Sequence, residues 1–459
     1  MTSEQIQEIV KKQKEFFSTG ATLSVAYRIE ALGKLRASME RHKAEVLEAL
    51  KTDLGKSEQE AFMCEYGLSL SELSYMKKHT RKYAKNRRAA TPLTNFAGKS
   101  FEKPSPYGTV LIMSPWNYPV LLTIEPLIDA ISAGNTVIVK PSAYSPACSS
   151  VLANIIRDAF DPEYVAVIEG GRAENQCLLD QKYDYIFFTG SQSVGRMVME
   201  KAASTLTPVT LELGGKSPCI IDKSANIKLA AKRVVFGKYL NCGQTCVAPD
   251  YILVHESVKE AFIEAVKLQI EKQFGKDPLS NDSYGKIINE KHFNRISKLI
   301  DDSKVIYGGK CNGETLKIEP TVMDNVTYDD AVMQEEIFGP VMPLITFSSI
   351  GEIIRDINSK AHPLALYIFA DDKSVLDKVT TECIFGGGCI NDTIIHLACS
   401  SLGFGGVGES GTGAYHGKKG FDTFSHIKSI VDKKNWIDLN MRYQPYKKSK
   451  LGMIKMFLK

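Results

Sequence analysis

The stretch GTVLIMSPWNYPVLLTIEPLIDAISAGNTVIVK, residues 108–140, decides the fold. It opens with a short apolar run at Thr109–Met113 and closes with another at Thr136–Val139. Between them, near Ile124–Ser132, lies a longer segment that we interpret as a helix. A strand, a helix and a second strand in this order predict two parallel strands of one sheet.

The same alternation continues beyond this stretch. Further strands are predicted at Val165–Ile168 and Tyr185–Phe188, and helices near Ser149–Ala159 and Val194–Ser204. Strands that alternate with helices indicate a parallel, doubly wound α/β sheet. A second such series follows Val209–Leu213, with strands near Pro218–Ile221, Tyr251–Val254 and Pro343–Thr346.

Two α/β domains are therefore expected, with their boundary near Thr210. Residues 1–209 would form a Rossmann-like dinucleotide-binding domain and residues 210–415 a catalytic domain. A chain of 459 residues is too long for one compact core, which supports this division. Before residue 90, few breakers interrupt the helical periodicity, which predicts helices at roughly Glu4–Phe17, Val25–Asp53 and Gln59–Ala84.

Composition and charge exclude several classes of protein. With 44% apolar and 24% charged residues, the chain is typical of a soluble globular enzyme. A net charge of +4 over this length indicates no nucleic-acid partner. No apolar run approaches the ~18 residues that span a bilayer, and the first residues lack a secretory signal. The ten scattered cysteines fit free thiols in a reducing compartment, so a cytoplasmic location is expected.

One cysteine has neighbours that suit catalysis. Cys246 follows Gly243, Gln244 and Thr245, whose backbone can direct N–H groups toward developing negative charge. A cysteine attacks a carbonyl carbon as its thiolate. Taken alone, Cys246 is more often a buried structural residue, and only its company favours a nucleophile. No histidine or further cysteine pair lies near Cys242 and Cys246, so no metal site is expected.

A carboxylate and an amide complete the candidate catalytic set. Glu212 ends an apolar run ahead of Gly214-Gly215, where burial would raise its pKa and make it a general base for water. Asn117 lies between two prolines in Ser114–Pro119, and its side-chain amide, with the Cys246 backbone N–H, is a candidate oxyanion donor. Without this context, an ion-paired or capping glutamate and an asparagine that stabilises its own turn fit equally well.

Three segments favour a dinucleotide cofactor. Gly190-Ser191-Gln192-Ser193-Val194-Gly195 follows a strand and opens a helix, although it is not Gly-x-Gly-x-x-Gly. Lys140 and Ser142 end another strand, where an ammonium and a hydroxyl suit an adenosine ribose. Glu336 suits the nicotinamide ribose and Phe338 its ring system, although each alone also fits a surface or core position. The thiol, the carboxylate and these segments together predict oxidation of an aldehyde.

The order of these motifs resembles the aldehyde dehydrogenase superfamily. The likeness extends from about Gln5 to Asn440 and runs through Trp116-Asn117, Lys140-Pro141-Ser142, Gly190-Ser191, Glu212–Lys216, Gly243–Cys246 and Glu336–Pro340. It implies that Cys246 adds to the aldehyde, that Asn117 binds the oxyanion, and that water activated by Glu212 hydrolyses the thioester. It also implies NAD or NADP as the cofactor, in contact with Trp116, Lys140, Ser142, Gly190, Ser191, Val194, Gly195, Leu213, Gly214, Glu336 and Phe338.

Other details resemble the short, class 3 branch, which holds enzymes for aromatic and fatty aldehydes. They are Thr207–Thr210, Cys246–Asp250 and Tyr415–Lys419. This likeness implies a homodimer, in which a small bridging β element near residues 85–106 and 416–440 joins each catalytic domain to its partner's sheet. The aldehyde itself is not determined. The candidate wall of the substrate tunnel comprises Tyr66, Met113, Tyr118 and Thr393–Ser401.

One departure from the superfamily concerns the choice of cofactor. Many relatives have a glutamate after Lys-Pro-Ser, whereas this chain has Ala143. Without that carboxylate, repulsion of a 2′-phosphate is relieved, and Arg172 adds a cation near the adenosine end. We therefore expect NADP to be accepted. A tolerated surface substitution is the alternative.

The C-terminal tail, residues 441–459, is basic. Lys447–Lys459 carries five lysines and no acid, with Leu451, Ile454, Phe457 and Leu458 at helical spacing. Three interpretations fit this segment: a gating helix over the partner's substrate tunnel, weak attachment to an anionic membrane surface, and a frayed basic end.

Two other functions compete with aldehyde oxidation to the acid. A CoA-acylating enzyme passes its thioester to coenzyme A and needs no base such as Glu212. A non-enzymatic protein that retained the fold has no use for Cys246, Glu212 and Asn117 together. The three residues therefore favour a hydrolytic aldehyde dehydrogenase.

Overall fold

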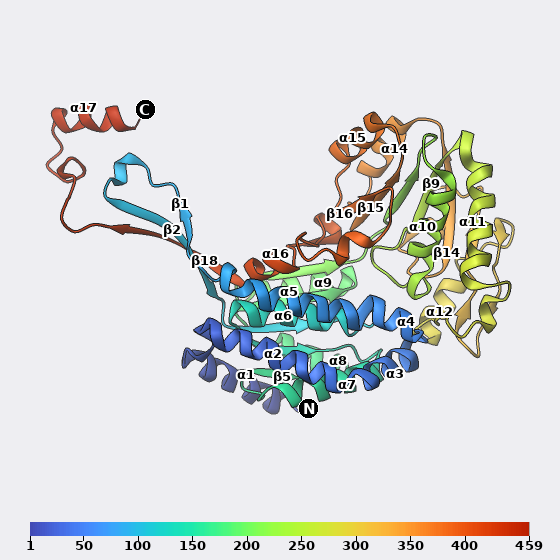
Figure 1. Ribbon diagram of the computed structural model, residues 1–459, viewed down its shortest axis with the longest axis horizontal. Helices are drawn as coiled ribbons and strands as arrows, with labels where there is room; N and C mark the ends of the chain where they lie inside the picture. The colour runs from blue at the N-terminus through green and yellow to red at the C-terminus, as the bar shows by residue number, and fades with distance from the viewer. Residues whose placement is uncertain (459) are drawn as a thin grey trace.

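The computed structural model describes residues 1–458 and consists of two α/β bodies and a projecting arm (Figure 1). The first body is built on a six-stranded sheet and the second on a seven-stranded sheet. The arm is a three-stranded sheet, and the C-terminal helix lies at its far end, away from both bodies. The expected α/β class, with a Rossmann-like part, a second α/β part and a small β element, is confirmed.

The first sheet contains the strand–helix–strand unit on which the fold was predicted. This unit is β3 (Thr109–Met113), α6 (Leu121–Ala133) and β4 (Thr136–Lys140), with β3 parallel to β4. Both strands are buried throughout, which explains their unbroken apolar runs. The other elements of this body are β5 (Val165–Val167), β6 (Tyr185–Gly190), β7 (Val209–Leu213), β17 (Gly411–Thr412), α7 (Pro146–Ala159), α8 (Arg172–Leu179) and α9 (Gln192–Ala203). The strand order is β17-β7-β6-β3-β4-β5, and only β17 is antiparallel to its neighbour.

The second sheet is also largely parallel. Its strands are β8 (Pro218–Ile221), β9 (Tyr251–His255), β10 (Val305–Tyr307), β13 (Thr321–Met323), β14 (Val341–Phe347), β15 (Ala365–Phe369) and β16 (Gly387–Ile390). They lie in the order β10-β13-β14-β9-β8-β15-β16, and β10 alone runs antiparallel to its neighbour. The accompanying elements are α10 (Ile227–Tyr239), α11 (Lys259–Phe274), α12 (Glu290–Ser297), α13 (Ala331–Gln334), α14 (Ile350–Asn358), α15 (Lys373–Glu382) and the β11–β12 pair (Cys311–Asn312, Lys317–Ile318).

The chain crosses from one sheet to the other after Leu213. Strand β7 pairs in parallel with β6, with Thr189 opposite Glu212, and the next strand, β8, belongs to the second sheet. The boundary expected near Thr210 therefore falls inside β7. Because carboxyl ends of parallel strands share one edge of a sheet, the ends of β3, β4, β6 and β7 bring their loops together there.

The helices before residue 90 are more divided than their periodicity predicts. They are α1 (Ser3–Ser18), α2 (Val25–Arg41), α3 (Lys43–Leu54), α4 (Glu58–Ala61), a π-helical turn (Phe62–Tyr66) and α5 (Gly67–Tyr83). The single helix expected at Val25–Asp53 breaks at His42, whose φ of −90° and ψ of 11° lie outside the helical range. Apolar spacing continues across this break, so periodicity alone does not reveal it.

The arm consists of β1 (Arg87–Ala89), β2 (Gly98–Pro106) and β18 (Ser425–Lys433), in that antiparallel order. Helix α16 (Gly417–Thr423) leads into β18, and the basic tail contains a helix, α17 (Lys448–Phe457). The tail residue Lys459 lies outside the described residues, and the side chain of Phe457 is not described. Over residues 1–458, no helix combines the length and the apolar character needed to cross a membrane.

Candidate active site

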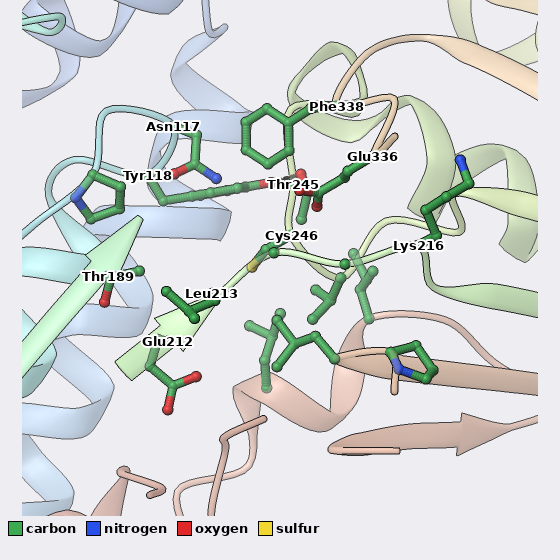
Figure 2. A pocket seen from close by; sticks show the side chains of 18 of the residues that line it. Asn117, Tyr118, Thr189, Glu212, Leu213, Lys216, Thr245, Cys246, Glu336 and Phe338 are labelled. Atoms are coloured by element: carbon green, nitrogen blue, oxygen red, sulfur yellow. Dashed lines mark hydrogen bonds between the residues drawn. The ribbon is translucent and has the colours of Figure 1, made fainter. Parts of the chain in front are cut away.

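A cavity of about 1050 Å³ lies where the carboxyl end of the first sheet meets the second body. Residues of both bodies line it, and ten of the predicted site residues are among them: Trp116, Asn117, Gly190, Ser191, Glu212, Leu213, Gly214, Cys246, Glu336 and Phe338. The predicted cofactor residues Lys140, Ser142, Val194 and Gly195 lie outside this wall. In Figure 2, Cys246 stands between Glu212 on one side and Asn117, Phe338 and Glu336 on the other.

The loop before Cys246 has an unusual backbone. Asn241, Cys242 and Gly243 have φ values of 52°, 53° and 73°, so three consecutive residues are left-handed. A Cβ at Gly243 would lie 2.3 Å from the carbonyl oxygen of Gly339, so only glycine fits there. The side chain of Asn241 holds the turn by donating to the carbonyl oxygen of Gln244 at 3.1 Å. This turn delivers Cys246, half-buried, to the cavity wall.

The surroundings of Cys246 favour the neutral thiol at rest. Burial raises the pKa of the Cys246 thiol, and the carboxylates of Glu336 and Glu212 raise it further. The backbone N–H groups of Cys246 and Val247 act in the opposite direction. Thiolate formation is therefore a step that must be driven, and the same two N–H groups face the region where negative charge would develop.

Asn117 comes to the thiol from the other body. It lies in the loop after β3, and its Nδ2 donates to the carbonyl oxygen of Gln244 at 3.0 Å. Because an amide nitrogen carries two hydrogens, one remains for a ligand. The Asn117 carbonyl oxygen accepts from Asn241 Nδ2 at 2.7 Å, which fixes the backbone of this loop against the cysteine loop.

Glu212 is buried and uncommitted. It lies near the end of β7 with 3% of its surface exposed, and neither carboxylate oxygen has a hydrogen-bond partner among the described residues. Burial raises its pKa well above the ordinary value. In Figure 2 the carboxylate points away from Cys246. A desolvated carboxylate of this kind is a strong proton acceptor once it is ionised.

Glu336 and two aromatic residues form the opposite wall. Glu336 packs so closely on the backbone that a Cβ at Gly214 would lie 2.1 Å from its Oε2. Burial, reinforced by the Asp250 carboxylate, raises the pKa of Glu336 to about 8, and its Oε1 has no partner among residues 1–458. The rings of Trp116 and Phe338 meet edge to face with their centres 5.4 Å apart.

The turn between β6 and α9 carries the predicted cofactor segment and lies beside the cavity. Ser191 occupies the N-cap position of α9 in an extended conformation, and its hydroxyl pairs with that of Ser193 at 3.2 Å instead of capping the helix. A Cβ at Gly195 would lie 2.6 Å from Leu213 Cδ2, so glycine lets α9 pack close to β7. The amide groups of the first helical turn are thus directed toward the cavity edge, where they suit an anion.

Lys140 and Ser142 lie at the end of β4, beyond the cavity wall. Lys140 Nζ donates to the carbonyl oxygens of Pro141 and Gly170, both at 2.7 Å. Burial lowers its pKa to about 8, and the Glu174 carboxylate opposes that shift. Ser142 Oγ accepts the N–H of Tyr144 at 3.2 Å. Both side chains therefore shape this loop within the protein itself.

Several residues that line the cavity were not predicted. His292 packs its ring 5.0 Å from that of Trp116, and Arg295 donates to the carbonyl oxygens of Glu336 and Ile337 at 3.3 and 2.6 Å. Both lie on α12, far along the chain from every motif, so no local pattern indicates them. Of the expected tunnel residues, Tyr118, Ile394, Ile395, Leu397 and Ala398 line the cavity, whereas Tyr66 and Met113 do not.

Known proteins resemble the chain over nearly its whole length. The model of the aldehyde dehydrogenase family matches residues 1–430. The chain is 46% identical over 456 residues to 4,4'-diaponeurosporen-aldehyde dehydrogenase of Staphylococcus aureus (strain NCTC 8325 / PS 47), with 99% of each protein covered. It is 41% identical over 443 residues to a dimeric, NADP-preferring aldehyde dehydrogenase of Canis lupus familiaris, covering 96% of this chain and 98% of that one. The substrate-bound structure of Staphylococcus aureus AldH agrees with a TM-score of 0.97 at 46% identity, covering 99% of both chains.

These similarities agree with the motif order and with the cavity at the junction of the two sheets. A family match over residues 1–430 and an identity of 46% over almost every residue leave neither the fold nor the reaction class open. The chain therefore belongs to the aldehyde dehydrogenase family and is an enzyme that oxidises an aldehyde with NAD or NADP.

Proposed function

We propose that Cys246 is the nucleophile of this oxidation, Asn117 the oxyanion donor, and Glu212 the base that activates the hydrolytic water. The observation that carries the proposal is the condition of Glu212, which is buried in the wall of the cavity that Cys246 also lines. Its two carboxylate oxygens lack partners within the described chain. A buried carboxylate without partners is costly for folding, so a role in catalysis explains it better than a structural role.

The first step is attack of the Cys246 thiolate on the aldehyde carbon. A C–S bond forms, and the carbonyl electron pair moves onto oxygen. The second Nδ2 hydrogen of Asn117 and the backbone N–H of Cys246 would bind that oxyanion. Because these bonds strengthen only as charge develops, their loss lowers kcat more than it weakens substrate binding.

The residues around the thiol fit a nicotinamide dinucleotide. Glu336 has a free acceptor oxygen for ribose hydroxyls, and the aromatic rings of Trp116 and Phe338 offer apolar faces. Ser191 at the N-terminus of α9 suits the diphosphate. When bound, the cofactor supplies the two-electron oxidant for the Cys246 adduct. The remaining proposed contacts are Lys140, Ser142, Gly190, Val194, Gly195, Leu213 and Gly214.

Oxidation leaves a thioester on Cys246, and Glu212 would complete its hydrolysis. Its carboxylate takes a proton from water while the water oxygen attacks the thioester carbon. The C–S bond then breaks, which releases the acid and restores the Cys246 thiolate. Since the carboxylate points away from Cys246 in Figure 2, its side chain must turn toward the thioester for this step.

Production of NAD(P)H in the absence of coenzyme A tests this assignment. Hydrolysis by Glu212 predicts sustained turnover without coenzyme A and release of the free acid. A single turnover that resumes only when coenzyme A is added would instead support the acylating reaction, in which Glu212 has no task.

We further propose a long, apolar aldehyde as the substrate. Aliphatic and aromatic side chains make up much of the cavity wall, and they include Met63, Leu68, Leu121, Leu122, Phe236, Leu240, Ile394, Ile395, Leu397 and Phe404. The Staphylococcus aureus relative is named for the aldehyde 4,4'-diaponeurosporen-aldehyde. Because each buried CH₂ contributes about 0.8 kcal/mol, kcat/KM should rise along a series of saturated aldehydes. A series whose shortest member is the best substrate would contradict this proposal.

The end of β4 supports use of NADP. Ala143 is exposed beside Tyr144, so no carboxylate at position 143 repels a 2′-phosphate. Arg172, exposed at the start of α8, adds a cation to this part of the first body. The Canis lupus familiaris relative is NADP-preferring by its name. We propose that this enzyme accepts both cofactors.

We also propose that the enzyme is a homodimer joined through its arm. Strands β1 and β18 are the two edges of the arm's sheet, and edge strands pair readily with another chain. The same relative is dimeric by its name. Light scattering during size-exclusion chromatography should give twice the 50.8 kDa of one chain. A particle of one chain's mass would contradict the dimer.

We propose that the enzyme is cytoplasmic and that its C-terminal tail attaches it weakly to membrane surfaces. Leu451 and Leu458 are 50% and 70% exposed, and the lysines of α17 lie close to them along the chain. Apolar side chains and cations together bind anionic bilayers reversibly. Sedimentation with anionic vesicles that is lost at high salt is expected, and no binding at low salt would contradict it.

A further inference from the structure

Lys56 is fully buried next to the active site, and the mechanism above gives it no task. It lies between α3 and α4, and its Nζ contacts Glu65 Oε1 at 2.5 Å. Neither side chain of this pair has any exposed surface. A buried ion pair is seldom more stabilising than apolar residues of the same size, so its presence suggests another use.

The other contacts of the pair all fall on one loop. Lys56 Nζ donates to the carbonyl oxygen of Asn117 at 3.2 Å and lies 4.0 Å from the centre of the Tyr118 ring. Glu65 Oε2 accepts the backbone N–H groups of Val120 at 2.8 Å and Leu121 at 3.2 Å. The ion pair therefore holds the loop after β3 in its middle and at its junction with α6.

This loop is also the one that meets the cysteine loop. The Asn117 amide donates to the carbonyl oxygen of Gln244, and the hydroxyls of Tyr118 and Thr245 are 2.7 Å apart. Gln244 and Thr245 immediately precede Cys246. Lys56 thus contacts Asn117 and Tyr118, two of the first-body residues that touch the nucleophile's loop; Glu60 of α4 is another, since its Oε1 accepts the backbone N–H of Asn241 at 2.8 Å.

We propose that Lys56, held by Glu65, is a positioning residue for the oxyanion hole. It fixes the Asn117 peptide, and with it the direction in which the Asn117 side-chain amide points. The proposal rests on the role of Asn117 proposed above. Displacement of a catalytic group by about 1 Å costs on the order of 10²-fold in rate, so a clamp on this peptide has a large effect on kcat.

The geometry separates this role from a direct effect on the thiol. Lys56 is absent from the described residues that line the cavity, and the pKa of Cys246 is shifted chiefly by burial, then by Glu336, Glu212 and two backbone amides. Removal of the ammonium should therefore leave thiolate formation unchanged while it slows attack on the aldehyde. If Lys56 only stabilised the fold, its removal would not slow attack on the aldehyde while leaving thiolate formation at Cys246 unchanged.

The test uses the full-length enzyme with Lys56→Met and Glu65→Gln combined. Glutamine keeps an oxygen for the N–H groups of Val120 and Leu121, and methionine fills the volume of the lysine stem, so the fold should be retained. We expect kcat to fall about 10- to 100-fold. The Kd of NAD(P)⁺ and the pH profile of Cys246 alkylation by iodoacetamide should remain as in the wild type.

A double-mutant cycle with Asn117→Ala shows whether Lys56 acts through Asn117. If it does, the triple variant is no slower than Asn117→Ala alone, because there is no amide left to position. If the kcat loss of the triple variant equals the product of the losses in Asn117→Ala and in Lys56→Met/Glu65→Gln, the proposal is overturned. An unchanged kcat in the Lys56→Met/Glu65→Gln enzyme would overturn it as well. Full activity of Asn117→Ala would instead overturn the oxyanion role of Asn117, and this inference with it.

Arg28→Met is the matched control. Arg28 is another buried cation that donates to backbone carbonyls, those of Thr22 at 2.7 Å and Ser132 at 3.3 Å, and it does not line the cavity. Its loss should lower the thermal unfolding temperature but leave kcat of the folded enzyme as it was. An equal loss of kcat in Arg28→Met would mean that any buried cation has this effect, which would contradict a positioning role specific to Lys56.

Discussion

The side-chain amide of Asn117 donates to the carbonyl oxygen of Gln244 at 3.0 Å, and this bond joins residues 127 positions apart. Asn117 follows a strand of the first sheet, whereas Gln244 lies in the loop after α10 of the second body. The proposed oxyanion donor and the nucleophile are thus assembled across the junction of two sheets. A substitution at either end of this hydrogen bond should therefore lower the catalytic rate more than it lowers the stability of the fold.

Asn117→Ala should lower kcat/KM by about 10²- to 10³-fold, the usual cost of one oxyanion donor. Steady-state NAD(P)H production measures the loss. Asn226→Ala is the matched control, because the exposed Asn226 caps α10 by accepting the N–H of Leu229 at 3.2 Å. That variant should lose about 1 kcal/mol of stability and no activity. Similar rates for Asn117→Ala and wild type would exclude the oxyanion role.

The rate should increase with pH. Burial raises the pKa of Glu212 and that of Cys246, and both groups act in their deprotonated forms. At neutral pH a smaller fraction of each group is ionised than its ordinary pKa would give. Attack and hydrolysis should therefore both accelerate as the solution becomes alkaline. Stopped-flow measurement separates the two pH dependences: the NAD(P)H burst reports attack by Cys246, and steady turnover reports hydrolysis by Glu212. A steady rate that declines from neutral to alkaline pH would be inconsistent with a Glu212 base.

Gly243→Ala should disrupt the cysteine loop. Gly243 has a φ of 73°, where an alanine costs roughly 1–2 kcal/mol, and its Cβ would lie 2.3 Å from the Gly339 carbonyl oxygen. Alkylation of Cys246 and thermal unfolding should both change. Gly452→Ala, with nothing within 4 Å of the added methyl group, should leave both as in the wild type. A fully active Gly243→Ala enzyme would show that the turn is not needed.

Ala143→Glu should turn the enzyme toward NAD. A carboxylate at this exposed position would repel a phosphate that carries about −1.5 to −2 charge, but it would accept a ribose hydroxyl. We expect kcat/KM for NADP to fall at least about tenfold, which corresponds to about 1.4 kcal/mol, while that for NAD holds or rises. Ala143→Gln, with the same shape and no charge, is the control. Equal effects of the two substitutions on NADP would rule out the electrostatic explanation.

Much of the fold could be predicted from the sequence because its central strands are buried on both faces. The runs at Thr109–Met113 and Pro218–Ile221 coincide with β3 and β8. Strand β7 was harder to assign, since its apolar pattern does not say which sheet it joins. Only its pairing with β6 places Glu212 on the first sheet, in the wall of the cavity that Cys246 of the second body also lines.

The site residues also fall into those that the sequence could predict and those that it could not. Cys246, Glu212 and Asn117 stand in motifs with local character, whereas His292, Arg295 and Lys56 do not. These three acquire their importance from contacts with Trp116, Glu336 and Asn117, which lie far away in sequence. Lys56 illustrates the difficulty, because a lysine between two helices is ordinarily a solvated charge. Its burial depends on a partner, Glu65, that becomes visible only when the π-helical turn is formed.

Intact-protein mass spectrometry of Glu212→Gln tests the central claim most directly. The variant is mixed with a long aldehyde and NAD(P)⁺, without coenzyme A, and is quenched after the burst. Because attack and oxidation need Cys246 but hydrolysis needs Glu212, an acyl group should accumulate on Cys246, and it should be absent when Cys246→Ser is treated in the same way. Steady turnover at the wild-type rate with no adduct on Cys246 would contradict the account.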